Sequence, residues 1–294
     1  MGVTEIVMAS EAIAAGHLTR NDLRRRYAKV HRNVYVRRGS DLTAVDRAVA
    51  AWLWSGREAV LVGNSAAAVL GAKWTSAEDP PELGRVRHPA PPEIIVRSGL
   101  LADDEVAAVA GRDCTTAART AYDLGRRLSP ERAVIRMDAL LHATKTPPSA
   151  VAAIGERYPG ARDIRRFRTA VDLADAGAES PQETRVRLLL VGSGLPRPRT
   201  QIPVTDADGR VLRRIDMGWP EWMVGVEYDG EQHFTGADDY AADIERLEFL
   251  ANRGWTIIRV SARQLRWERP AIVARVERAL AAAGMPRDDG CCAF

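Results

Sequence analysis

The stretch from Ile215 to Phe234, IDMGWPEWMVGVEYDGEQHF, decides how the C-terminal part of this chain folds. From Val224 to Tyr228 apolar residues recur at alternate positions, as in a β-strand with one buried face. Successive strand side chains point to opposite faces, so Glu227 and Asp229 must share the other face. Two adjacent carboxylates repel each other and are costly beside an apolar strand unless something neutralises them. The stretch therefore predicts a strand with an acidic pair that needs a compensating positive charge.

The composition is that of a folded globular protein. The chain has 294 residues, of which 46% are hydrophobic and 28% charged, and this length suggests two or three domains. No apolar run approaches the ~20 residues of a transmembrane helix, and the N-terminal stretch carries acids and lacks the basic region of a signal peptide. The cysteines Cys114, Cys291 and Cys292 match neither a disulfide framework nor a CxxC metal site. We therefore expect a cytoplasmic protein with no membrane partner.

The first segment, residues 1–45, has the pattern helix, turn, helix and β-hairpin. Residues Glu5 to Ala15 predict a helix, and Thr19 with Asp22 forms a variant of the capping box at the start of the next helix. The sequence VHRNVYVRRG then alternates apolar and polar residues, which suits a short hairpin. Together these elements predict a winged helix-turn-helix.

This first segment is strongly basic. Between Arg20 and Arg38 there are eight Arg or Lys residues against the single acid Asp22, a local charge of about +7 that is typical of a phosphate-contacting face. The residues expected to bind DNA are Arg20, Asn21, Arg24, Arg25, Lys29 and Arg32. Sequence readout would come from the recognition helix, through Asn21, Arg24 and Arg25. A solvated basic helix that binds nothing is the alternative.

The second segment, residues 46–178, predicts a mixed α/β domain. AVDRAVAAWLWSG and NSAAAVLGAKW are helical by spacing, and EIIVR reads as a strand. A helix capped by Thr115 or Thr116 follows, and SPERAVIRMDALLHAT predicts another. The segment contains no cluster of His, Cys or carboxylates with catalytic spacing, so we expect a scaffold or a surface for a partner protein.

These two segments together resemble the abortive-infection type IV antitoxin family. The resemblance rests on GHLTRNDLRRRYAKVHRNVYVRRGS and on CTTAARTAYDLGRRL. It implies a winged-helix DNA-binding head followed by an antitoxin-like α/β companion domain. It does not by itself imply an antitoxin, because such heads are reused widely.

The third segment, residues 179–294, predicts the element order α-β-β-β-α-β-α. A helix starts at Ser180, with Pro181 at its first position, and two strands are joined through Asp208–Gly209. MVGVEYDG is the third strand, and an amphipathic helix follows from Asp238 to Arg253. The apolar stripe expected on that helix consists of Tyr240, Ile244, Leu247 and Ala251. WTIIRVSA reads as a strand buried on both faces, and ERPAIVARVERALAAAG as the last helix.

This order and its acids resemble the PD-(D/E)XK nuclease fold, and within it the endonuclease domains grouped with very-short-patch-repair endonucleases. The downstream run DIERLEFLANRGWTIIRV belongs to the same pattern. The matching candidate catalytic residues are Glu183, Asp216, Glu227, Asp229 and His233. The resemblance covers the third segment and implies a restriction-endonuclease-like core that hydrolyses phosphodiester bonds.

Such a reaction needs a cation, and the acids suit one. Mg²⁺ and Mn²⁺ prefer hard oxygen ligands, and a bound ion can polarise a phosphate and acidify a water. Asp216 and Glu227, on neighbouring strands, can converge on one ion. Asp229 is a further expected ligand, and the resemblance implies the carbonyl of Tyr228 as another. The expected cofactor is therefore Mg²⁺ or Mn²⁺.

One residue departs from the pattern, because Asp229 stands where the family usually has a lysine that orients or deprotonates the attacking water. The chain has no lysine after Lys145, and arginine cannot replace a base because it stays protonated. Two alternatives remain. Asp229 helps to bind a second ion, or His233, with an ordinary pKa near about 6.5, acts as general base.

Structural roles are also open for these residues. Glu183 completes a capping box with Ser180, Asp216 could pair with Arg213 or Arg214, and flanking arginines could neutralise both acids of the strand. Farther along, Asp243 and Arg246 predict an ion pair on the solvated face of their helix.

Two functions follow from these observations. The first is a metal-dependent endonuclease that hydrolyses DNA and is targeted by the N-terminal winged helix. The alternative is a DNA-binding transcriptional regulator or antitoxin-like protein with a catalytically inactive nuclease fold. The expected partner is DNA, with a homodimer or a protein bound through the middle segment left open.

Overall fold

A computed structural model describes residues 4–230 and 237–286 of the chain. The chain forms two compact units, Met1–Ala176 and Gly177–Phe294, each of which is described by itself. Over the described residues the protein is a multidomain α/β protein with three separate sheets and twelve α-helices. None of the described helices combines the length and the apolar character needed to cross a membrane.

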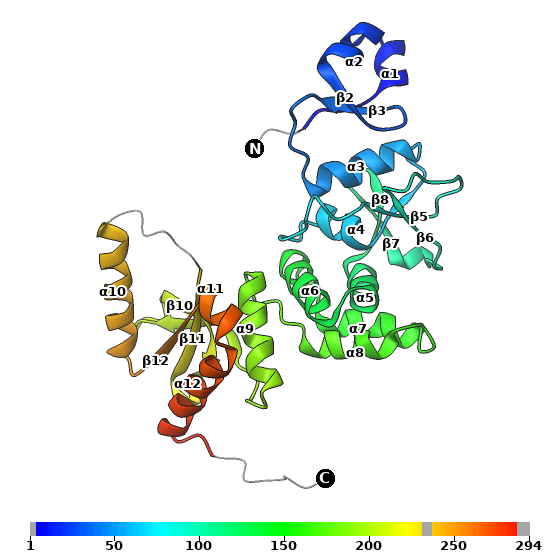
Figure 1. Cartoon of the computed structure of the whole chain (residues 1–294). Helices are drawn as coiled ribbons and strands as arrows, with labels where there is room; N and C mark the ends of the chain where they lie inside the picture. Colours follow the sequence, from blue (N-terminus) through cyan, green and yellow to red (C-terminus); the bar gives the residue numbers. More distant parts are fainter. Residues whose placement is uncertain (1–3, 231–236, 287–294) are drawn as a thin grey trace. The chain divides into compact units, whose positions relative to one another are not determined.

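The N-terminal part of the first unit is a small sheet with two helices (Figure 1). Three strands pair antiparallel in the order β1-β3-β2. The elements are β1 (Ile6–Met8), α1 (Ala9–Ala14), α2 (Arg20–Arg26), β2 (Tyr27–His31) and β3 (Val34–Arg37). The capping box that the sequence predicts is confirmed, because Thr19 Oγ1 accepts from Asp22 N at 3.1 Å and Asp22 Oδ2 accepts from Thr19 N at 3.1 Å.

The helix expected from Glu5 to Ala15 is partly wrong. Its first apolar residues form β1, in which Ile6 pairs with Val36 of β3. A helix there would have left the outer edge of β3 without a partner strand, so long-range pairing overrides the local preference for a helix. The helix that remains, α1, is shorter than expected.

The rest of the first unit is a five-stranded sheet followed by helices. The strand order is β6-β5-β4-β8-β7. The elements are α3 (Ala44–Trp54), β4 (Val60–Leu61), α4 (Gly63–Val69), β5 (Glu82–Gly84), β6 (Ile95–Arg97), β7 (Val106–Val109), β8 (Arg112–Thr115), α5 (Ala117–Arg127), α6 (Pro130–Thr144), α7 (Pro148–Arg157) and α8 (Ile164–Leu173). The predicted helices and the strand EIIVR are found, with Thr116 as the cap of α5.

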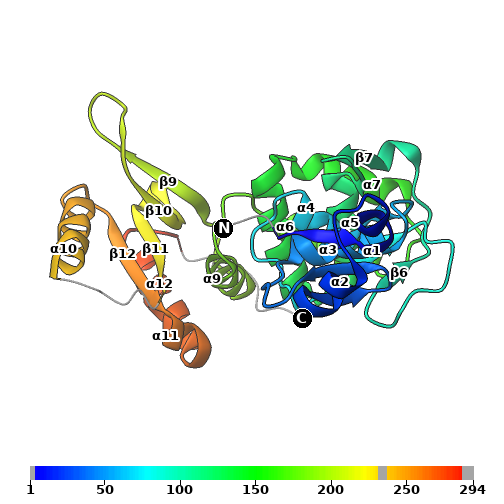
Figure 2. The same ribbon diagram turned by 90° about the horizontal axis from the view of Figure 1, so that it is seen from above.

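The second unit has one four-stranded sheet with helices on both faces (Figures 1 and 2). The elements are α9 (Pro181–Gly192), β9 (Arg199–Thr205), β10 (Val211–Trp219), β11 (Val224–Asp229), α10 (Ala237–Ala251), β12 (Thr256–Ser261), α11 (Ala262–Trp267) and α12 (Arg269–Ala282). The strand order is β12-β11-β10-β9, and β11 with β12 is the parallel pair. The predicted order of helices and strands is found, with α11 as an additional short helix.

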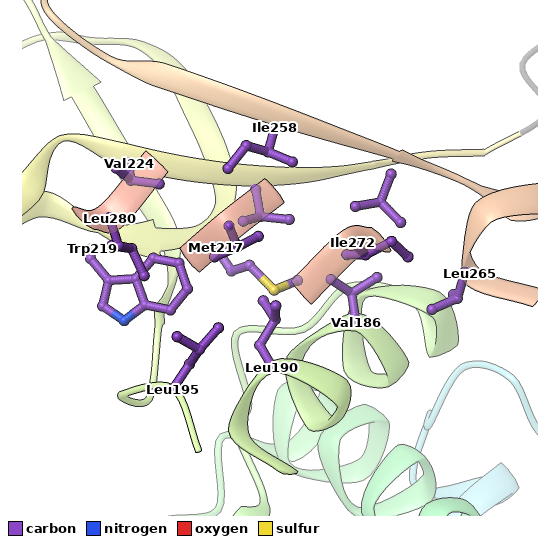
Figure 3. Packing of buried hydrophobic residues seen from close by; sticks show 13 residues of the cluster. Val186, Leu190, Leu195, Met217, Trp219, Val224, Ile258, Leu265, Ile272 and Leu280 are labelled. Carbon is purple, nitrogen blue, oxygen red and sulfur yellow. The ribbon is translucent and has the colours of Figure 1, made fainter. Parts of the chain in front are cut away.

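Two hydrophobic clusters hold the second unit together, one on each face of the sheet. On one face α9 and α12 pack against the strands through Val186, Leu190, Met217, Ile258 and Ile272 (Figure 3). On the other face α10 contributes Leu250, which packs with Ile215 and Trp255. The sheet is therefore covered by helices on both faces.

Two predictions for this unit are wrong in detail. The apolar stripe of α10 does not run along Ile244 and Ala251, because Ile244 is 41% exposed and Ala251 is also exposed. Leu250 is the residue that is fully buried against the sheet. Strand β12 is fully buried on one face only, since Arg259 on the other face is half-buried and charged. Each of these two elements carries an arginine that pairs with an acid of β11, Arg246 on α10 and Arg259 on β12.

Candidate functional site

Asp216 lies where β10 and β11 separate. The antiparallel ladder between these strands runs from Trp219–Val224 to Met217–Val226. One residue farther on, the Asp216 side chain makes the connection, because Oδ2 accepts a hydrogen bond from the backbone N–H of Tyr228 at 2.9 Å. A carboxylate thus takes the place of a backbone acceptor at this point.

The strand β10 also changes orientation at Asp216. Ile215 belongs to the cluster with Leu250, whereas Met217 belongs to the cluster of α9 and α12. Alternate residues of a regular strand share one face, so this distribution requires a local rotation of the strand at Asp216. The rotation places Asp216 at an irregular position, where its side chain can reach the neighbouring strand.

Glu227 is 3% exposed and its partner is Arg246 of α10. The two side chains form an ion pair through Glu227 Oε1 and Arg246 Nη2. This corrects the expectation that Arg246 lies on the solvated face of its helix. Leu250, one helical turn later and on the same face, is buried against the sheet, and this face carries Arg246 toward β11.

Asp229 is paired with a second arginine. Arg259 Nη2 of β12 lies 2.6 Å from Asp229 Oδ2, and both side chains are about one-third exposed. In the parallel register Arg259 is the partner of Glu227, so it reaches diagonally to the next acid on the same face. Arginines therefore neutralise both acids of the strand, which is the structural role considered for them in the sequence.

Glu183 lies at the N-terminus of α9 and is largely buried. Half of the expected capping box is present, since Ser180 Oγ accepts from Glu183 N at 3.1 Å. The Glu183 carboxylate instead accepts from Glu179 N at 2.9 Å. Burial raises the pKa of Glu183, the Glu179 N–H lowers it, and the negative charge of Asp216 raises it. Glu183 and Asp216 are therefore close enough to interact electrostatically.

Asp216 has a raised pKa of its own. Burial is the largest cause, and the charge of Glu179 adds to it. The Tyr228 N–H and the positive charge of Arg246 lower the pKa of this carboxyl. The expected alternative partner Arg213 donates instead to the carbonyl of Leu212 at 2.9 Å. Asp216 thus lies in an acidic environment in which Arg246 supplies positive charge.

We call Glu183, Asp216, Glu227 and Asp229 the acidic cluster. Carboxylates are residue types that fit a divalent cation. Asp216 and Glu227 are hard oxygen donors on adjacent strands, as Mg²⁺ or Mn²⁺ requires, and burial raises the pKa of Asp216, so a bound cation would stabilise its charged form. Among the described residues, however, no group of three or more His, Cys, Asp or Glu side chains is gathered closely enough to hold a metal ion. His233 lies outside the described residues.

The six residues expected to bind DNA are all exposed and lie on α2 and the following hairpin. They are Arg20, Asn21, Arg24 and Arg25 on α2, Lys29 on β2, and Arg32 in the turn before β3. On the opposite side of α2, Leu23 packs into a small core with Ala9 and Tyr27. The helix therefore presents its basic residues to solvent.

Two curated relatives are similar to most of the chain. The uncharacterized protein MT2308 of Mycobacterium tuberculosis strain CDC 1551 / Oshkosh is 30% identical over 232 residues, which is 77% of this chain and 85% of the relative. The uncharacterized protein Rv2248 of strain ATCC 25618 / H37Rv matches with the same identity and coverage. No protein-family model matches the chain, and no solved structure matches it. The chain belongs to the same family as these two mycobacterial proteins.

Proposed function

We propose that this protein is a metal-dependent DNA endonuclease of the PD-(D/E)XK type. The observation that carries the proposal is the junction of β10 and β11, where Asp216 bonds to the backbone of Tyr228 beside the buried Glu227. A structural role alone gives little reason to place the buried Glu183 within electrostatic reach of Asp216, because like charges repel and burial is costly.

In this proposal Mg²⁺ or Mn²⁺ is held by Asp216 and Glu227, with the carbonyl of Tyr228 and Asp229 as further ligands. When bound, the ion polarises the phosphate and acidifies a water molecule. The Tyr228 N–H fixes the orientation of Asp216 through Oδ2. Burial raises the pKa of Glu183, which makes its carboxylate more basic than an exposed one, so Glu183 is the candidate proton acceptor from the water.

The same proposal assigns DNA binding to the first unit. Two helices and a hairpin, with the six exposed basic and polar residues on α2 and the hairpin, are the arrangement expected of a winged helix. The local excess of arginine and lysine supplies attraction to phosphates. In this view the first unit selects where on DNA the second unit cuts.

Cleavage of supercoiled plasmid and of single-stranded DNA in the presence of Mg²⁺ or Mn²⁺ tests the proposal. Asp216→Asn and Glu227→Gln remove one negative charge each while keeping the side-chain shape, and each should abolish cleavage. Glu221→Gln is the matched control, because Glu221 is exposed in the short turn before β11. Equal cleavage by all four proteins, or cleavage by none, would refute an endonuclease that uses this cluster.

A specific observation favours the second candidate function, a DNA-binding regulator or antitoxin-like protein with an inactive nuclease fold. Glu227 and Asp229 are each paired with an arginine, and the second unit contains no lysine. Calorimetric titration with Mn²⁺ separates the two functions. Binding that is lost in Glu227→Gln supports the enzyme, whereas DNA binding without Mn²⁺ binding supports the regulator.

A further inference from the structure

Arg246 is the positive charge that two acids of the cluster share. It pairs with Glu227, and its charge also acts on Asp216. Its position is set by α10, whose Leu250 is fully buried one turn later. The other arginine of the site, Arg259, is bound to Asp229 at 2.6 Å. Arg246 is therefore the arginine that pairs with one of the two proposed metal-binding carboxylates and acts electrostatically on the other.

A divalent ion and Arg246 compete for the same carboxylate. Like charges about 4 Å apart repel strongly even at an effective dielectric constant of about 20, enough to weaken binding by several powers of ten if neither moves. The side-chain ends of arginines are carried on flexible stems, and Arg246 is about one-third exposed. Its guanidinium can therefore leave Glu227 without unfolding of α10.

We propose that a metal ion displaces Arg246 from Glu227, and that the released guanidinium then binds the phosphate to be cleaved. This inference rests on the proposed function. A guanidinium stays protonated, so it cannot replace the missing lysine as a base. Its planar set of donors does match two phosphate oxygens. The pairing with Glu227 is thus the resting arrangement of a phosphate-binding residue.

Titration calorimetry with Mn²⁺ tests the competition. Arg246→Gln removes the charge and should bind Mn²⁺ at least about tenfold more tightly than wild type, because less repulsion opposes the ion. Arg246→Lys keeps the charge and should stay near the wild-type affinity. The matched control is Arg253→Gln, since Arg253 is exposed and its guanidinium lies 3.9 Å from the centre of the Phe249 ring. An Arg246→Gln affinity equal to or weaker than that of wild type would overturn the proposal.

The salt dependence of DNA binding tests the phosphate contact. Each neutralised phosphate changes the slope of log affinity against log salt by about −0.9. With a short fluorescent duplex and no metal, wild type and Arg246→Gln should have equal slopes, because Arg246 is held by Glu227. With Ca²⁺ present, the wild-type slope should be steeper than that of Arg246→Gln by about 0.9.

A second variant keeps the test decisive if Arg246→Gln does not fold. Glu227→Gln removes the negative charge that pairs with Arg246, so the metal-free slope of this variant should already be steeper than that of wild type. Slopes that differ between wild type and Arg246→Gln equally with and without Ca²⁺ would overturn displacement. If wild type binds Mn²⁺ and Arg246→Gln binds it with the same affinity, this inference is refuted and the proposed function is not. No Mn²⁺ binding by wild type or Arg246→Gln refutes the proposed function as well.

Discussion

Replacing Gly218 by alanine should separate the two strands that carry the acidic cluster. A Cβ at this position would lie 2.3 Å from the carbonyl oxygen of Val224 and 2.8 Å from the Cα of Gly225. Both are backbone atoms of β11, so no side chain can rotate away, and β10 or β11 must move. Overpacking of this kind costs about 1–3 kcal/mol. The movement would also lengthen the hydrogen bond between Asp216 and Tyr228 N–H.

Hydrogen exchange measured by mass spectrometry on the full chain checks this prediction. A loss of about 1–3 kcal/mol corresponds to faster exchange by about 5- to 150-fold in peptides that cover β10 and β11. The matched control is Gly192→Ala at the end of α9, where a Cβ would meet nothing within 4 Å. Gly192→Ala should leave exchange in β10 and β11 unchanged. Unchanged exchange in Gly218→Ala would show that the close approach of these strands is not as described.

Three further predictions concern stability and binding. Burial raises the pKa of Asp216 in the folded state. The folded state therefore keeps the proton of Asp216 at pH values above 3.8, where the unfolded state loses it, and the free energy of unfolding of wild type falls as the pH rises above 3.8. Asp216→Asn should therefore be more stable than wild type at neutral pH, with the difference vanishing below about pH 3.8 in chemical denaturation. Thr19→Ala should cost about 1 kcal/mol of local stability in α2, read from hydrogen exchange of that helix. Arg24→Gln should reduce the salt slope of DNA binding by about 0.9, and an unchanged slope would remove Arg24 from the DNA interface.

Much of the local structure could be predicted from the sequence because its signals are local. Thr19 with Asp22 and Pro181 after Ser180 mark helix starts, and both helices begin there. Asp208–Gly209 joins β9 and β10 as expected. The sequence does not predict strands β4, β5, β7 and β8, since each has only two to four residues and β4 forms through pairing with β5 and β8, which are distant in sequence.

The candidate site was predictable only in part. The placement of Asp216, Glu227 and Asp229 follows from strand periodicity, and their strands are adjacent. The pairing of Arg246 with Glu227 depends on which face of α10 packs against the sheet. The apolar residues of that helix do not form one clear stripe, since Ile244 is exposed and Leu250 buried. Residues four apart share a helix face, so the burial of Leu250 places Arg246 on the face that packs against the sheet.

The hydrogen bond from Tyr228 N–H to Asp216 has a consequence for how substitutions at this position are interpreted. The carboxylate both connects two strands and supplies charge to the cluster, so Asp216→Ala removes a structural acceptor together with the charge. An asparagine can still accept from the same N–H. In a saturation mutagenesis screen, the difference in the screened property between the asparagine and alanine variants at position 216 would therefore measure the contribution of the hydrogen bond between the strands. The difference between wild type and the asparagine variant would measure the contribution of the negative charge.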